Sequence, residues 1–148
     1  MIRRTRAREV ALQLLFQRDL NPKAVPRAAV ERFARERLTD RESVAFCLAI
    51  YDGVNAHREA IDALLTATAS NWRLSRMMPA DRNVLRIGTF ELRHAAERQP
   101  IPVVLDEAIE LSRRFGTANS PGFVNGVLDR VAKAPLPPAK EPAAASGS

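Results

Sequence analysis

The spacing of apolar residues is the feature that most constrains the fold of this 148-residue chain. Apolar side chains recur three and four positions apart, as in Val10, Ala11, Leu14 and Leu15, and this period places them on one face of an α-helix. No segment shows the alternation of apolar and polar residues that a half-buried β-strand requires. The pattern therefore predicts an all-α protein with about seven helices, in two small bundles that share one core.

The predicted domain is a single helical unit at residues 1–134, with an N-terminal half at 1–70 and a C-terminal half at 71–134. At this length a domain buries about two thirds of the surface of its unfolded chain. The sequence after residue 134 is rich in proline and alanine and poor in larger apolar residues. Residues 135–148 are therefore predicted to form a disordered tail.

Local signals predict where several helices begin and end. Thr39 and Glu42 have the spacing of a capping box, which would start a helix. Gly116 follows an apolar-periodic run, where a helix end favours a residue that tolerates positive φ. Ser120 followed by Pro121 fits an N-cap and a first-turn proline, so the last helix would begin after a very short connection.

Three positions inside predicted helices indicate internal packing. Gly88 costs about 1 kcal/mol relative to alanine in a helix interior, and a close crossing with another helix is the expected compensation. Arg82 and Arg86 share a helix face, where they could bind an anion or pair with acids inside the protein. We favour the internal pairing.

The residues that usually carry chemistry are scarce and scattered. The single cysteine, Cys47, lies on an apolar helical stripe, excludes an intrachain disulfide and fits a cytoplasmic location. His57 and His94 have no neighbouring ligand set, so we expect no metal site. The sequence contains no P-loop, no dinucleotide-binding glycine motif and no HExxH. We therefore predict no catalytic residue, no cofactor and no enzymatic activity.

Charge favours an anionic partner. The net charge is +6, and most of the 23 basic residues are arginine, which binds phosphate with two parallel hydrogen bonds and stacks on bases. GC-rich coding also produces an arginine-rich and alanine-rich composition, so charge alone does not identify the partner. Arg3, Arg4, Arg6 and Arg8 lead directly into an apolar helix, which is a compact nucleic-acid footprint. The alternative is a solvated basic end.

An ordered set of short motifs, spanning about Arg4 to Lys133, resembles the NusB family of transcription antitermination factors. In chain order the motifs are Arg6-Ala7-Arg8-Glu9, Trp72 to Met77, Asp81-Arg82, Leu85-Arg86-Ile87, Phe90-Glu91-Leu92, the turn Pro100-Ile101-Pro102, and residues 115–129 with Phe-Val-Asn-Gly-Val-Leu-Asp at 123–129. Each motif is weak by itself, whereas their shared order is specific.

The resemblance implies an all-helical factor that binds boxA-type single-stranded RNA together with NusE, a small-subunit ribosomal protein. It would act on elongating RNA polymerase and support transcription of ribosomal RNA operons. A homodimer is possible, and the oligomeric state and the preferred RNA sequence stay open. The alternative is a stand-alone RNA-binding or protein-interaction module related to the N-terminal domain of ribosomal RNA methyltransferases.

The resemblance also implies which residues form the binding surfaces. The RNA surface would comprise Arg3, Arg4, Arg6, Arg8, Phe115, Asn119, Ser120 and Phe123. The NusE surface would include Phe16 and Asp81. At helical spacing Phe16, Phe115 and Phe123 fit the core as well as an exposed stacking platform, so both alternatives remain open.

Two positions depart from the family pattern. The family usually has an acid where this chain has Asn119, and a neutral side chain beside the RNA should keep or strengthen RNA binding. Asp106 replaces a usual asparagine at a helix start, where both residue types cap, so we expect little effect.

Overall fold

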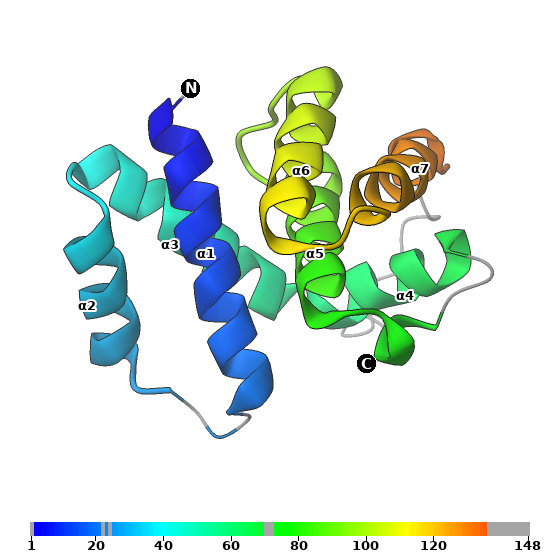
Figure 1. The fold of residues 1–148 in the computed structure, drawn as a ribbon. Helices are drawn as coiled ribbons and strands as arrows, with labels where there is room; N and C mark the ends of the chain where they lie inside the picture. Colours follow the sequence, from blue (N-terminus) through cyan, green and yellow to red (C-terminus); the bar gives the residue numbers. More distant parts are fainter. Residues whose placement is uncertain (1, 22, 24, 70–72, 136–148) are drawn as a thin grey trace, which may run out of the picture.

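A computed structural model describes residues 2–21, 23, 25–69 and 73–135 of the chain. Within these ranges the protein consists of seven α-helices and one 3₁₀ turn, with no β-strand (Figure 1). The elements are α1 (Ile2–Leu20), α2 (Arg27–Arg37), α3 (Arg41–Ala56), α4 (Arg58–Thr68), η1 (Leu74–Arg76), α5 (Pro79–Arg93), α6 (Ile101–Phe115) and α7 (Ser120–Lys133). The predicted all-α fold is confirmed. Trp72 and the predicted tail beyond residue 135 lie outside the described residues.

The helices form two groups joined by α1 and α5. In Figure 1, α1 lies with α2 and α3, while α6 and α7 stand beside α5. Helix α4 packs against α5 and α7 as well as α3, and α1 contacts α5 directly. The buried apolar residues of both groups belong to one continuous core cluster. None of the described helices is long and apolar enough to cross a membrane.

Helix α5 is the centre of the packing. It contacts α1, α3, α4, α6 and α7, and every residue from Asn83 to Leu92 is buried. A helix enclosed on all sides must pair its polar residues internally, because water cannot reach them. The polar contacts of α5 therefore connect it to its neighbours.

The expected close crossing at Gly88 is confirmed. A Cβ at Gly88 would lie 2.6 Å from Cδ1 of Leu128, so the absence of a side chain allows α5 to approach α7. Gly53 does the same between α3 and α5, where a Cβ would lie 2.0 Å from the Phe90 ring. Both glycines give up helix propensity and gain closer packing.

The expected internal pairing of Arg86 is also confirmed. Its guanidinium donates to both carboxylate oxygens of Asp62, at 2.9 and 3.0 Å, and to Oδ1 of Asn83 at 3.1 Å. Asn83 in turn donates to Asp19 at 2.9 Å. Burial raises the pKa of Asp19, but the Asn83 hydrogen bond and the Arg86 charge outweigh it and hold that pKa below its ordinary value. The cluster connects α1, α4 and α5.

The predicted capping box at Thr39 is wrong, because α3 starts one residue later than expected. Asp40 is the N-cap, and its carboxylate accepts from the Ser43 backbone N–H at 3.0 Å and from the Ser43 hydroxyl at 2.8 Å. Asp40 also brings a negative charge to the positive end of the helix dipole, which a threonine does not.

Candidate nucleic-acid interface

The N-terminal arginines lie on different faces of α1. Arg3 and Arg6 are exposed, whereas Arg4 is partly buried and Arg8 is fully buried. The Arg4 guanidinium lies 4.4 Å from the centre of the Phe46 ring, so it is held against α3 while part of it remains accessible. The exposed basic surface at the start of α1 therefore consists of Arg3, Arg6 and part of Arg4.

The structure corrects the prediction that Arg8 binds RNA. Arg8 is 2% exposed, and its guanidinium makes a two-bond pair with Glu91 of α5. It also lies 3.5 Å from Glu107 of α6. Reaching a phosphate would break a buried ion pair, so Arg8 holds α1 against the central helix instead.

The connection between α6 and α7 forms a tight turn whose side chains point in different directions. Asn119 is exposed and takes the N-cap position of α7, without a side-chain capping bond. Ser120, predicted as the N-cap, is the first helical residue and is buried. Its hydroxyl accepts from the Thr117 backbone N–H at 2.9 Å. The Ser120 side chain therefore closes the turn, which corrects its prediction as the N-cap, and only its backbone at the start of α7 remains a candidate for the predicted RNA contact.

Gly116 is required at this turn for a different reason from the one expected. Its φ is −104°, so it does not adopt the positive φ that the sequence suggested. A Cβ at Gly116 would lie 2.4 Å from the hydroxyl oxygen of Ser120. The glycine makes room for the Ser120–Thr117 hydrogen bond, and so for the short connection.

The three candidate phenylalanines differ in exposure. Phe16 is 41% exposed and Phe115 is 37% exposed, so both rings are available at the surface. Phe123 is partly buried and packs against the core cluster. The sequence left open whether these rings lie in the core or at the surface. The structure places Phe16 and Phe115 at the surface and Phe123 mainly in the core.

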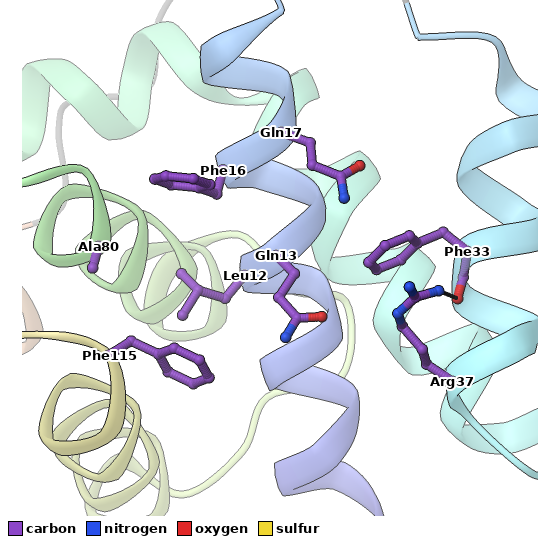
Figure 2. A pocket seen from close by; sticks show the side chains of 8 residues that line it. All are labelled: Leu12, Gln13, Phe16, Gln17, Phe33, Arg37, Ala80 and Phe115. Carbon is purple, nitrogen blue, oxygen red and sulfur yellow. Dashed lines mark hydrogen bonds between the residues drawn. The ribbon is translucent and has the colours of Figure 1, made fainter.

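Phe16 and Phe115 line one hollow of about 540 Å³, shown in Figure 2. Their rings enter it from α1 and α6, while Phe33 and Arg37 of α2 lie on its other side. The Arg37 guanidinium stacks on the Phe33 ring at 3.5 Å from its centre. We call this hollow the aromatic groove; the remaining residues that line it are Leu12, Gln13, Gln17 and Ala80.

A second hollow, of about 400 Å³, joins the other predicted residues. Asp81 lines it together with Asn119, Ser120 and Phe123. Asp81 is 9% exposed, and its Oδ1 has no hydrogen-bond partner among the residues that the structure describes. The acid predicted to face NusE thus lies beside the turn predicted to face RNA, so the two predicted surfaces adjoin.

Arg114 was missed by the sequence analysis and connects the α1 arginines to this turn. Glu9 of α1 is 3% exposed, and its carboxylate accepts from Nη1 of Arg6 at 3.0 Å and from Nη1 of Arg114. These three residues and Thr5 line a hollow of about 390 Å³. The Arg114 guanidinium also lies 5.8 Å from the centre of the Phe115 ring, so Arg114 connects the basic end of α1 to a residue of the aromatic groove.

A further small hollow extends the basic surface towards α2. Arg3, Arg6 and Arg37 line it, together with Asp40 at the start of α3. In the sequence, the one indication that Arg37 belongs to this basic surface is its position one turn after Phe33. That spacing is common on any solvated helix.

The candidate groups for other chemistry lie away from this surface. Burial raises the pKa of the Cys47 thiol to about 12, so a thiolate nucleophile is disfavoured there. His57 and His94 stack on each other with ring centres 4.4 Å apart. In the part of the chain that the structure describes, no three histidine, cysteine, aspartate or glutamate residues are placed to hold a metal ion.

Comparison with known proteins gives a consistent result. The NusB family model matches residues 5–133. A transcription antitermination protein NusB from Anaeromyxobacter dehalogenans is 44% identical over 138 residues, which cover 93% of this chain and 95% of that protein. The NusB protein of Bdellovibrio bacteriovorus is 40% identical over 131 residues, covering 88% and 96%.

Solved NusB structures have the same fold as this chain. T. maritima NusB superposes with a TM-score of 0.78 at 36% identity, covering 90% of this chain and 93% of that one. A crystal structure of the antitermination factors NusB and NusE with double-stranded RNA gives a TM-score of 0.80 at 24% identity, covering 91% and 99%. At that identity the second likeness shows the fold alone.

Proposed function

The chain belongs to the NusB family of transcription antitermination factors, and we propose that it binds boxA-type single-stranded RNA together with NusE on elongating RNA polymerase. In this role it supports the transcription of ribosomal RNA operons. As a member of this family it is not an enzyme. The relatives that match most of its length, such as the Anaeromyxobacter protein, are named transcription antitermination proteins, which favours this function over a module related to methyltransferases.

The single observation that supports RNA binding best is the continuity of basic and aromatic surface. Arg6 and Arg114 meet at Glu9, and Phe115 lies next to Arg114 at the aromatic groove. Single-stranded RNA is bound by a positively charged path for its backbone and by aromatic side chains on which bases stack. Both features occur here on one face.

We assign the RNA contacts as follows. Arg3, Arg6 and the accessible part of Arg4 contact phosphates, because guanidinium groups match the geometry of phosphate oxygens. Phe115 stacks on an unpaired base. Asn119 lies at the start of α7, where backbone N–H groups and the helix dipole favour an anion.

We assign NusE to the surface around Phe16 and Asp81. Phe16 is a large exposed apolar side chain in the aromatic groove, and such side chains in hollows are common anchors of protein interfaces. Asp81 lines the second hollow and has one carboxylate oxygen without a hydrogen-bond partner among the described residues, so a basic group of NusE that enters this hollow would find an acceptor there. Because these surfaces adjoin, NusE and RNA should contact each other when both are bound and increase each other's affinity.

Titration of a boxA-type RNA and a scrambled RNA, with and without NusE and at several salt concentrations, tests this function. We expect tighter binding of the boxA-type RNA, a further gain with NusE, and an affinity that falls by about 0.7 log units per log unit of salt for each phosphate contacted. Equal, salt-independent binding of both RNAs in the presence of NusE would refute the proposal.

A further inference from the structure

We propose that Arg6 and Arg114 form a clamp for one phosphate of the RNA backbone, and that buried Glu9 positions both guanidinium groups. The inference rests on the proposed function and deepens it. It assigns a binding role to Arg114 and a positioning role to Glu9, neither of which follows from the sequence.

The geometry of Glu9 is the first argument. One carboxylate accepts from two arginines on different helices, Arg6 on α1 and Arg114 at the end of α6. The carboxylate is almost fully buried, whereas Arg6 is 45% exposed and Arg114 is 53% exposed. The acid thus fixes one end of each guanidinium group from below while the arginines remain accessible from above.

Charge is the second argument. Two guanidinium groups and one carboxylate leave a net positive charge at the hollow that these residues line with Thr5. Each arginine donates to Glu9 from Nη1, and a guanidinium group has five N–H donors. A phosphate oxygen can therefore accept from both arginines without displacing the carboxylate.

The identity of the ligand follows from what flanks the hollow. Arg3 and Arg6 line the adjoining hollow on one side, and Phe115 lies on the other, with its ring centre 5.8 Å from the Arg114 guanidinium. A strand that runs from Arg6 along Arg114 to a base stacked on Phe115 passes over Glu9. The group it presents there is a phosphodiester.

A purely structural bridge between α1 and α6 is the competing explanation. It accounts for one arginine on the buried acid but gives no reason for a second, half-exposed one, because exposed ion pairs contribute about 0–1 kcal/mol to stability. The two explanations also predict different effects of substitution on RNA binding.

The experiment compares Arg114→Gln with Arg113→Gln in titrations of boxA-type RNA at several salt concentrations. Arg113 is the matched control, since it lies on the same helix, is exposed and pairs with Glu110 at 3.0 Å, away from the clamp. We expect Arg114→Gln to weaken binding roughly tenfold and to reduce the salt slope by about 0.7. Arg113→Gln should change the affinity less than about twofold. Equal effects of the two variants would overturn the clamp.

Glu9→Gln tests the positioning role by the sign of its effect. If Glu9 acted only through its charge, removing that charge would tighten RNA binding. Positioning predicts weaker binding instead, because neither arginine keeps a charged partner. Melting curves identify loss of folding, and Arg114→Lys, which keeps the charge but not the planar group, should restore only part of the affinity. Tighter binding by folded Glu9→Gln would refute the positioning role.

The two proposals fail in different ways. If the unmodified protein shows no salt-dependent binding of boxA-type RNA, with or without NusE, the proposed function itself is wrong. If the unmodified protein binds and Arg3→Gln weakens it while Arg114→Gln matches Arg113→Gln, only the clamp is wrong.

Discussion

The guanidinium group of Arg8 donates to the carboxylate of Glu91 from Nε at 2.8 Å and from Nη2 at 2.7 Å, and so joins the start of α1 to the middle of α5. Burial alone would lower the pKa of Arg8, but the hydrogen bonds and charge of Glu91 outweigh it and raise that pKa above its ordinary value. Arg8 therefore stays charged inside the fold.

Breaking this pair should be costly. We expect Glu91→Gln to lower the free energy of unfolding by about 3–5 kcal/mol, because it leaves Arg8 buried with only the more distant Glu107 as a counter-charge. Urea denaturation measures the loss. Arg27→Gln is the control, since it breaks an equally close pair with Asp52 that is half exposed, and it should cost less than about 1 kcal/mol. Similar losses for the two variants would contradict the interpretation.

Replacing a helical glycine by alanine should have opposite effects on stability at Gly88, where α5 crosses α7, and at Gly122, where a Cβ has open space. Gly88→Ala should destabilise the protein by about 1–3 kcal/mol, because the new methyl group overlaps Leu128. Gly122→Ala should be stabilising by about 0.5–1 kcal/mol, since a Cβ at Gly122 meets no atom within 4 Å and alanine is the better helix former. Thermal and urea unfolding measure both. A stabilising Gly88→Ala would show that the crossing can relax.

The N-cap of α3 predicts a pH-dependent contribution to stability. The hydroxyl of Ser43, followed by its backbone N–H, holds the pKa of Asp40 below its ordinary value of 3.8. A lowered carboxyl pKa contributes stability above the ordinary value, and this is lost as pH falls through the lowered one. Asp40→Ala should therefore lower the melting temperature at neutral pH, and the difference should shrink below pH 3.8. Thr39→Ala should leave the melting temperature unchanged, and a pH-independent loss for Asp40→Ala would exclude this cause.

Asn119 predicts the direction of a charge effect on RNA binding. Asn119→Asp adds a negative charge to an exposed position beside the proposed RNA path, so binding should stay unchanged or weaken by up to about tenfold at low salt. Titration at two salt concentrations measures it, and the loss should diminish at the higher one. A clear tightening would contradict the proposed role of this turn.

Substitution of Phe16 should affect the contribution of NusE without affecting the binding of RNA alone. Because its ring is exposed in the aromatic groove, Phe16→Ser should leave folding and RNA binding without NusE nearly unchanged. The gain in RNA affinity on adding NusE should fall by about tenfold or more, as expected for an interface anchor. An undiminished gain would place NusE elsewhere.

The fold could be predicted because its signals are local. Each helix is indicated by apolar residues three and four positions apart. Gly88 likewise indicated a close helix crossing, although the sequence did not identify the partner helix. Helix starts were less certain, since Thr39 and Asp40 are adjacent and both can cap. The choice between them depends on which carboxylate or hydroxyl reaches Ser43 in the folded chain.

The site was only partly predictable, because its important contacts are distant in sequence. Glu9 and Arg114 are 105 residues apart, and Arg8 and Glu91 are 83 apart, and no spacing rule connects such pairs. A signal for Arg8 did exist. Leu12 and Leu15 follow it by four and seven positions, which places Arg8 on the buried face of α1, whereas Arg6 falls on the opposite side.

The Arg8–Glu91 pair has a consequence for the order in which the protein is made. Arg8 leaves the ribosome 83 residues before Glu91, so the nascent first helix carries a charge and an apolar stripe that nothing yet covers. Helices α2 and α3 can cover part of this stripe as they emerge, but the side that faces α5 stays open until the central helix has been synthesised. Until then the uncovered apolar side of the emerging helix favours aggregation, even though the sequence is strongly helical from its first residues.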